Sequence, residues 1–171
     1  MGIYVYICPT EKPPVPKYKL IGEFECRLDN KSRIFLPSGL KKQINPDAQD
    51  KFLLTRGFEG CLVLFPWDAW EELSNKFDDL NLFDPESRRF MRAFQMGANE
   101  LVLDNQNRLV LPKKLLDFAS IDRDIILFAY NDRIEIWDKA TYEQQTAIDP
   151  VEYANLAARV MVKKERKDAP A

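Results

Sequence analysis

Hydrophobic and polar positions alternate along a segment near the start of the chain. Phe24, Cys26 and Leu28 are separated by charged residues, which is the period of a strand with one buried face. A short stretch rich in Asp and Asn then predicts a tight turn, and residues 34–36 continue as a second strand. Pro37 follows at a position suited to opening a short helix. The pattern therefore predicts the order strand, turn, strand, helix.

The same pattern recurs 75 residues further along. Residues 22–40 (GEFECRLDNKSRIFLPSGL) and 97–115 (GANELVLDNQNRLVLPKKL) are identical at nine of nineteen positions. Two apolar runs follow each copy and predict a hairpin, at 52–55 with 62–65 and at 125–127 with 133–137. One four-stranded unit of about 45 residues buries too little surface to be stable alone. We therefore expect both copies to share one core as a pseudo-twofold β-barrel, the alternative being two small domains on a helical linker.

Helical patterns lie between and after the two units. Residues 67–80 carry an apolar stripe, residues 85–96 follow an Asp-Pro start and stop at Gly97, and another helix starts at Asp149. The predicted organisation is an extended N-terminal arm at 1–20, a first unit at 21–69, a helical linker at 70–97, a second unit at 98–141, and a C-terminal helix with a disordered tail at 142–171.

Composition excludes several classes of function. The net charge is −2, from 25 Lys+Arg and 27 Asp+Glu, so any nucleic-acid surface must be local. The chain has no histidine, which removes Ser-His-Asp triads and histidine metal sites. Its three cysteines form no CxxC motif and fit a reducing cytoplasm. No apolar run reaches the roughly 20 residues of a membrane span. We expect no enzyme activity, cofactor, metal, membrane contact or small-molecule substrate.

The repeated turn is the candidate for chemistry, with the pattern Asp-x-x-x-Arg-x-x-x-Pro. It starts at Asp29 in the first copy and at Asp104 in the second. Residues 27–42 hold five basic residues and one acid, a local +4, whereas residues 102–117 hold three basic residues and two acids, a local +1. Arginine presents a planar fork of donors that suits a phosphate or a guanine edge. The alternative is that both motifs are turn-stabilising ion pairs, each contributing about 0–1 kcal/mol.

The two copies also differ in hydrophobicity. Arg27 and Phe35 of the first copy align with Val102 and Val110 of the second, so we expect the second unit to be buried on both faces, as at a subunit contact. The first turn would then bind a polyanion, and the second would mainly pack. The candidate DNA-contacting residues are Arg33, Lys31, Asn30, Ser32, Asp29, Arg27, Lys41, Lys42 and Arg108. Among these, Arg27, Lys41 and Lys42 are expected to hold phosphates.

Five segments in order resemble the MraZ family, of the SpoVT-AbrB type. They are GEFECRLDNKSRIFLP, LLTRGFEGCLVLFPWDAWEEL, DPESRRFMRAFQMGA, LDNQNRLVLPKKL and RIEIWDKATYE. The resemblance implies an α+β fold, with two tandem AbrB-like β-hairpin units fused into a pseudo-twofold β-barrel with peripheral helices. It also implies closed homo-oligomeric rings in the cytoplasm, associated with the nucleoid. Such rings bind double-stranded DNA at promoter repeats and typically repress the division and cell-wall gene cluster that contains their own gene.

The family's DNA-binding arginine corresponds to Arg33, with Asp29 as its acidic partner and Lys31 as the basic turn residue. The chain departs from the family at Ser32 and Asn107, where glycine usually precedes the arginine. Two alternatives remain: an AbrB-type antitoxin, and a ring-forming scaffold without DNA binding. DNA affinity that falls steeply with salt would distinguish the regulator from the scaffold.

Overall fold

The computed structural model describes residues 17–165. It divides into two compact units, one ending at Asp138 and the other beginning at Lys139. Most of the predicted N-terminal arm and the end of the charged tail lie outside the described residues. The predicted turns, strands and candidate contact residues all lie in the first unit.

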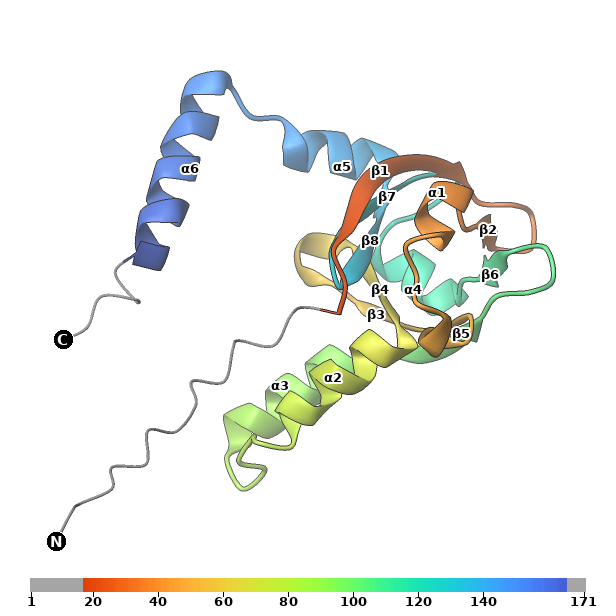
Figure 1. Ribbon diagram of the computed structural model, residues 1–171, viewed down its shortest axis with the longest axis horizontal. Coiled ribbons are helices and arrows are strands. Elements are labelled where there is room, and N and C mark those ends of the chain that lie inside the picture. The colour runs from red at the N-terminus through yellow and green to blue at the C-terminus, as the bar shows by residue number, and fades with distance from the viewer. Residues whose placement is uncertain (1–16, 166–171) are drawn as a thin grey trace, which may run out of the picture. The chain divides into compact units, whose positions relative to one another are not determined.

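The first unit is built on a six-stranded antiparallel sheet (Figure 1). In spatial order the strands are β1 (Leu20–Arg27), β7 (Asp124–Asn131), β8 (Arg133–Asp138), β4 (Leu62–Pro66), β3 (Lys51–Arg56) and β5 (Asn99–Val102). A separate two-stranded sheet pairs β2 (Arg33–Phe35) with β6 (Arg108–Val110). The fold is therefore α+β with a large antiparallel sheet, in agreement with the predicted class.

The strands on either side of each predicted turn do not pair with each other. β1 pairs instead with β7 from the second half of the chain, and β5 pairs with β3 from the first half. The bonds next to the turns follow the same rule: the Leu28 amide donates to Arg123 at 2.8 Å, and the Leu103 amide donates to Asp50 at 2.9 Å. The expected self-contained β-hairpin units are thus replaced by strand exchange between the halves.

The expected closed barrel is not formed by the described strands. The six-stranded sheet ends at β1 on one side and β5 on the other, and β2 and β6 lie in their own small sheet. One continuous core nevertheless spans both halves of the sequence, with Ile34, Leu54, Leu64, Leu109 and Ile136 all fully buried in it. This shared core contradicts the alternative of two separate small domains on a linker.

Short helices follow the strands as the sequence predicts. Pro37 and Pro112 immediately precede α1 (Ser38–Lys41) and α4 (Lys113–Phe118), each as its N-cap residue. Two 3₁₀ helices, η1 (Pro46–Ala48) and η2 (Phe58–Gly60), occupy the loops around β3. Cys61 is buried after η2, as expected for a small apolar side chain.

Two longer helices, α2 (Trp67–Phe77) and α3 (Pro85–Gln95), form a hairpin that projects from the sheet (Figure 1). Their facing sides are aromatic: the rings of Trp70 and Phe94 stack at 6.3 Å, and Phe77 meets Phe94 edge-on at 5.2 Å. Aromatic pairs at this spacing each contribute about 0.5–1.5 kcal/mol beyond their buried area. Trp70 therefore belongs to packing, as does the buried Trp137.

The second unit is helical. It contains α5 (Lys139–Thr146) and α6 (Pro150–Glu165), and α6 begins one residue after the predicted start at Asp149. The large apolar side chains of α6 are exposed, with Val151 and Met161 each at 70%. Among residues 17–165, no helix combines the length and apolar character needed to span a membrane.

Candidate nucleic-acid interface

Asp29 organises the first turn through its carboxylate. Its Oδ1 accepts from the backbone amides of Lys31 at 2.8 Å and Arg33 at 2.9 Å, and its Oδ2 accepts from Arg33 Nε at 2.7 Å. The amide of Asp29 also donates to the Arg33 carbonyl at 2.9 Å. One carboxylate therefore closes the turn and fixes the guanidinium through Nε, which leaves donors on the terminal nitrogens available for a ligand.

Asp104 builds the second turn in the same way. Oδ1 accepts from the amides of Gln106 at 2.8 Å and Arg108 at 2.9 Å, while Oδ2 accepts from Arg108 Nε at 2.8 Å. The Arg108 Nη2 also lies 2.8 Å from the same oxygen. The ion-pair interpretation of both motifs is therefore correct in geometry, and it is compatible with binding because each guanidinium retains free donors.

These hydrogen bonds keep both carboxylates ionised. Those from the Arg108 side chain and backbone lower the pKa of the Asp104 carboxyl below its ordinary value. Partial desolvation opposes the same change at Asp29, but hydrogen bonds from Arg33 and Lys31 outweigh it and the pKa of Asp29 is also lowered. A lowered folded pKa means that this turn stabilisation is present at neutral pH and is lost only as acid protonates the carboxylates.

The residue before each arginine adopts a left-handed conformation. Ser32 and Asn107 both have φ of 58°, in the region that glycine occupies without steric cost. Their carbonyls connect the halves reciprocally, because the Leu111 amide donates to Ser32 at 2.8 Å and the Leu36 amide donates to Asn107 at 2.9 Å. The left-handed conformation that glycine adopts most easily is thus adopted here by two non-glycine residues, and the strain falls mainly on Ser32.

Replacing Ser32 with glycine should stabilise the fold. The substitution removes a side-chain clash at positive φ, an effect of about 1 kcal/mol that is partly offset by the greater freedom of glycine in the unfolded chain. Asn107→Gly should gain less, because asparagine tolerates this conformation better than serine. Urea denaturation of both variants measures the difference, and a loss of stability in Ser32→Gly would contradict this account.

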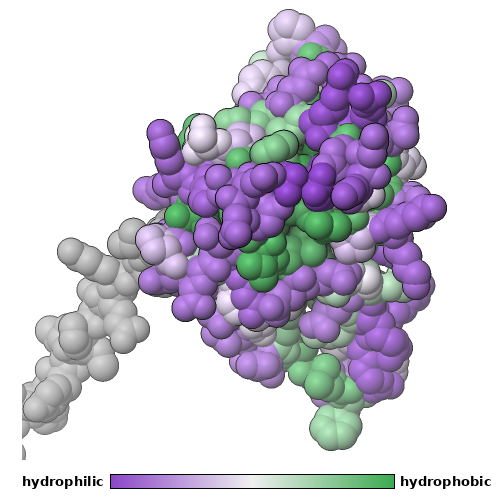
Figure 2. Space-filling model, turned by 90° about the vertical axis from the view of Figure 1, so that its right-hand side faces the viewer, coloured by the Kyte–Doolittle hydropathy of each residue, from purple (hydrophilic) through white to green (hydrophobic). Residues whose placement is uncertain are grey.

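The two arginines share one face of the ribbon formed by β2 and β6. In the register of this ribbon, Arg33 lies opposite Val110 and Phe35 lies opposite Arg108, while Ile34 points into the core. The Arg108 guanidinium also lies over the Phe35 ring, 6.0 Å from its centroid. Figure 2, viewed from the side on which β2 and β6 lie in Figure 1, shows an apolar patch surrounded by hydrophilic residues. Phe35 and Val110 are the exposed apolar residues of the ribbon.

The structure does not make the second turn a packing element within the chain. The Arg33 and Arg108 side chains are similarly accessible, at 24% and 19%. Val102 and Val110, which we expected to be buried at a subunit contact, are 59% and 56% exposed in the single chain. Burial of this face in a contact between copies therefore stays a prediction.

The other candidate residues fall into two groups. Asn30 and Lys31 are exposed in the first turn, and Lys42 is exposed at the end of α1. Arg27 and Lys41 are instead engaged within the protein: Arg27 Nε donates to Asp124 at 2.8 Å, and Lys41 Nζ donates to the Asn107 side chain of the second turn. No sequence signal could reveal this last contact, because its partners are 66 residues apart and meet only through strand exchange.

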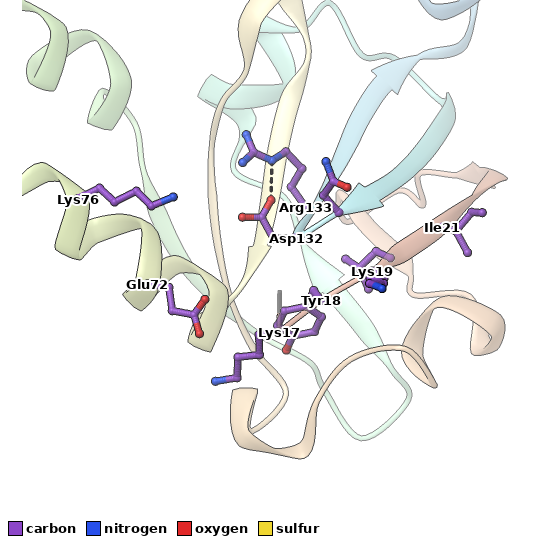
Figure 3. Close-up of a pocket in the computed structure, with 10 residues that line it drawn as sticks. Lys17, Tyr18, Lys19, Ile21, Glu72, Lys76, Asp132 and Arg133 are labelled. Atoms are coloured by element: carbon purple, nitrogen blue, oxygen red, sulfur yellow. Dashed lines mark hydrogen bonds and ion pairs between the residues drawn. The ribbon is translucent and has the colours of Figure 1, made fainter. Parts of the chain in front are cut away.

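A hollow lies at the N-terminal end of β1. An extended strand of this length places it about 23 Å from the first turn. Its volume is about 900 Å³. Its lining mixes both charge signs, and Figure 3 shows the Arg133–Asp132 pair, joined at 2.8 Å. Tyr18 lines the hollow as well and is otherwise buried; its hydroxyl donates to Asp68 Oδ1 at 2.6 Å, and burial raises the pKa of Tyr18. The chain is thus part of the fold from at least Tyr18 onward, earlier than the predicted arm boundary.

The fold and its turns define a duplicated α+β protein that presents one aspartate-paired arginine from each half. The family model described as "MraZ protein, putative antitoxin-like" matches residues 20–93 and again 94–162. Two proteins named "Transcriptional regulator MraZ" are 40% and 38% identical to this chain over 143 residues, from Christiangramia forsetii and Flavobacterium psychrophilum. Each alignment covers 83% of this chain, with 92% and 91% of the respective relatives.

A relative of the same name from Clostridium acetobutylicum is 41% identical over 119 residues, covering 70% of this chain and 81% of its own. The chain therefore belongs to the MraZ family. The two matches to the family model follow one another along the chain, in the order of the two predicted units. The relatives are named as regulators, a non-enzymatic class, in agreement with the prediction that this chain is not an enzyme.

Proposed function

We propose that this protein is a sequence-specific DNA-binding transcriptional regulator, acting as a repressor of the division and cell-wall gene cluster that includes its own gene. The single observation that carries the proposal is the outward ribbon face, on which Asp29 and Asp104 each orient one arginine. The names of the relatives support regulation of transcription. The site would be cytoplasmic and nucleoid-associated, because its partner is genomic DNA.

In this proposal Arg33 enters a DNA groove with Lys31 and Asn30 beside it, and Lys42 holds a phosphate. Exposed basic side chains such as Lys42 would contribute affinity without sequence preference. To bind a phosphate, Arg27 would have to release its ion pair with Asp124. This pair is weak because the Arg27 side chain is 66% exposed to solvent. Lys41 supports the second turn, so its contribution to DNA binding would be indirect.

The arrangement of the chain that we propose is pseudo-twofold, with tandem AbrB-like units at 21–69 and 98–141. Strand exchange supports it, since β1 with β7 and β5 with β3 are equivalent pairs under the repeat. The reciprocal bonds at Ser32 and Asn107 obey the same relation. Such an arrangement would present both arginines in related poses on one surface.

One chain makes few DNA contacts, so affinity would come from a closed homo-oligomeric ring on tandem promoter repeats. Simultaneous binding at two sites raises the effective affinity by about 10²–10⁴ without any new contact. The ring would also explain why a weak single turn is sufficient for regulation.

A gel-shift titration of the DNA upstream of the chain's own gene tests the proposal. We expect binding to intact tandem repeats, weaker binding to scrambled repeats, and affinity that falls steeply between about 50 and 200 mM salt. Equal affinity for both DNAs would refute sequence specificity. No binding by an intact oligomer would favour the scaffold alternative or the antitoxin function to which the family description refers.

A further inference from the structure

The loop that joins α2 and α3 holds a phenyl ring in solvent. Phe83 is 93% exposed and the neighbouring Leu82 is 57% exposed. The loop is nevertheless tightly bonded: Arg88 Nη1 donates to the carbonyls of both residues at 2.8 Å, and Asp84 caps α3 by accepting from the Ser87 amide at 2.9 Å. We call residues 78–84 the tip. Its hydrophobic side chains are therefore held outward by a defined loop structure.

An apolar groove lies along the C-terminal half of α3. It has a volume of about 280 Å³ and is lined by Arg56, Gly57, Phe58, Phe90, Ala93, Phe94, Met96 and Phe118. Phe58 and Met96 are 74% and 51% exposed on it. The groove and the tip are the two ends of one hairpin, so both are fixed to the same rigid element.

The groove contains a cation without a carboxylate partner among the described residues. The Arg56 guanidinium lies over the Phe118 ring, 4.4 Å from its centroid. Its Nε is buried and makes no hydrogen bond within the described part of the chain. A buried donor of this kind is costly when it is left unpaired. The groove therefore suits an apolar ligand that also carries a hydrogen-bond acceptor for Arg56.

The tip supplies both features. Beside Leu82 and Phe83 it carries Asp78 and Asp79, both exposed and without an ion pair among residues 17–165. Hydrophobic atoms also lie at the lower end of the molecule in Figure 2, where the helical hairpin ends in Figure 1. The apolar side chains and carboxylates of the tip thus match the aromatic lining and the arginine of the groove.

We propose that the tip of one copy of this chain inserts into the groove of a second copy, with Phe83 against Phe58 and Phe118 and an Asp78 or Asp79 carboxylate on Arg56. The contact does not form within one chain, because Phe94 in the groove lies nine residues along α3 from Pro85, beside the tip, which is about 14 Å at 1.5 Å per residue. The contact joins two different surfaces, so each copy can bind one neighbour through its tip and another through its groove. Such a head-to-tail contact yields a ring when the rotation between successive copies adds up to a full turn. The inference rests on the proposed function, because it names the contact that would hold the proposed ring together.

Two single variants test the two sides of the contact. Phe83→Ser removes the tip side chain, and Phe58→Asp places a carboxylate in the groove where it would pair with Arg56. Both positions are exposed, so melting temperatures should stay near that of the parent. In sedimentation velocity we expect each variant to lose the large assembly and run as a monomer. Ile21→Ser, at an equally exposed apolar position outside tip and groove, is the matched control and should keep full size.

Mixing the two variants gives the sharpest outcome. Phe83→Ser chains keep a groove and Phe58→Asp chains keep a tip, so a 1:1 mixture should form heterodimers and nothing larger. The proposal is overturned if Phe83→Ser retains the parent size, if the mixture stays monomeric, or if Leu156→Ser on α6 dissociates the assembly while Phe83→Ser does not. Arg33→Ala should leave the assembly size unchanged, so a failed contact and a failed DNA site give different results.

Discussion

Replacing Arg33 with alanine should reduce affinity for tandem-repeat DNA by roughly 5- to 150-fold for each engaged turn, equivalent to about 1–3 kcal/mol. The substitution removes a guanidinium whose Nε is fixed by Asp29 at 2.7 Å on the outer face of the β2–β6 ribbon. A guanidinium group that is already oriented loses little conformational freedom when it binds DNA. Its removal should therefore lose most of the free energy of its contacts with DNA. Gel-shift titration at fixed salt measures the change, with oligomer size measured in parallel.

Three companion variants separate the roles of the basic residues. Arg33→Lys keeps the charge but loses the planar fork, so it should retain the salt dependence and relax the sequence preference. Lys42→Ala should weaken binding uniformly across sequences. Arg108→Ala should affect binding less than Arg33→Ala, since the second copy has the smaller local charge. A larger loss at Arg108 would reverse the assignment of the two turns, and unchanged affinity in Arg33→Ala would exclude it as the DNA contact.

Replacing Ile34 with alanine should lower the free energy of unfolding by about 2–5 kcal/mol. Ile34 is fully buried, and its partner across the ribbon is Leu109, which is also fully buried. The cavity would form beneath the ribbon that carries both arginines. We therefore expect weaker DNA binding as well, although Ile34 itself cannot reach DNA.

Thermal unfolding followed by circular dichroism should show a decrease of roughly 4–20 °C, from about 2–4 °C per kcal/mol for a chain of this size. Val110→Ala is the matched control, because it shortens an outward side chain of the same ribbon that is 56% exposed. It should change stability by no more than about 0.5 kcal/mol. Equal losses in the two variants would contradict the placement of the core below the ribbon.

Local patterns along the sequence predicted the elements well. Alternation around Phe24 predicted β1, whose burial alternates along the strand, and the Asp-Pro start at Asp84 predicted α3 with its capping bond. The turn motif predicted the Asp29–Arg33 pair, and the departure at Ser32 identified a residue with positive φ. These features depend on residues within four positions of each other, so backbone and side-chain preferences act on them directly.

The repeat in the sequence determined that two equivalent turns exist and that each carries an arginine fixed by its own aspartate. Only the tertiary structure decided that β1 pairs with β7 and β3 with β5, that β2 and β6 form one ribbon, and that both arginines share its outer face. It also left Val102 and Val110 exposed and brought Lys41 to the second turn. The physical reason is that the same alternation of apolar residues can be buried by pairing within a half or between halves. The choice depends on which pairing buries the larger shared core, and that core is assembled from residues far apart in the chain.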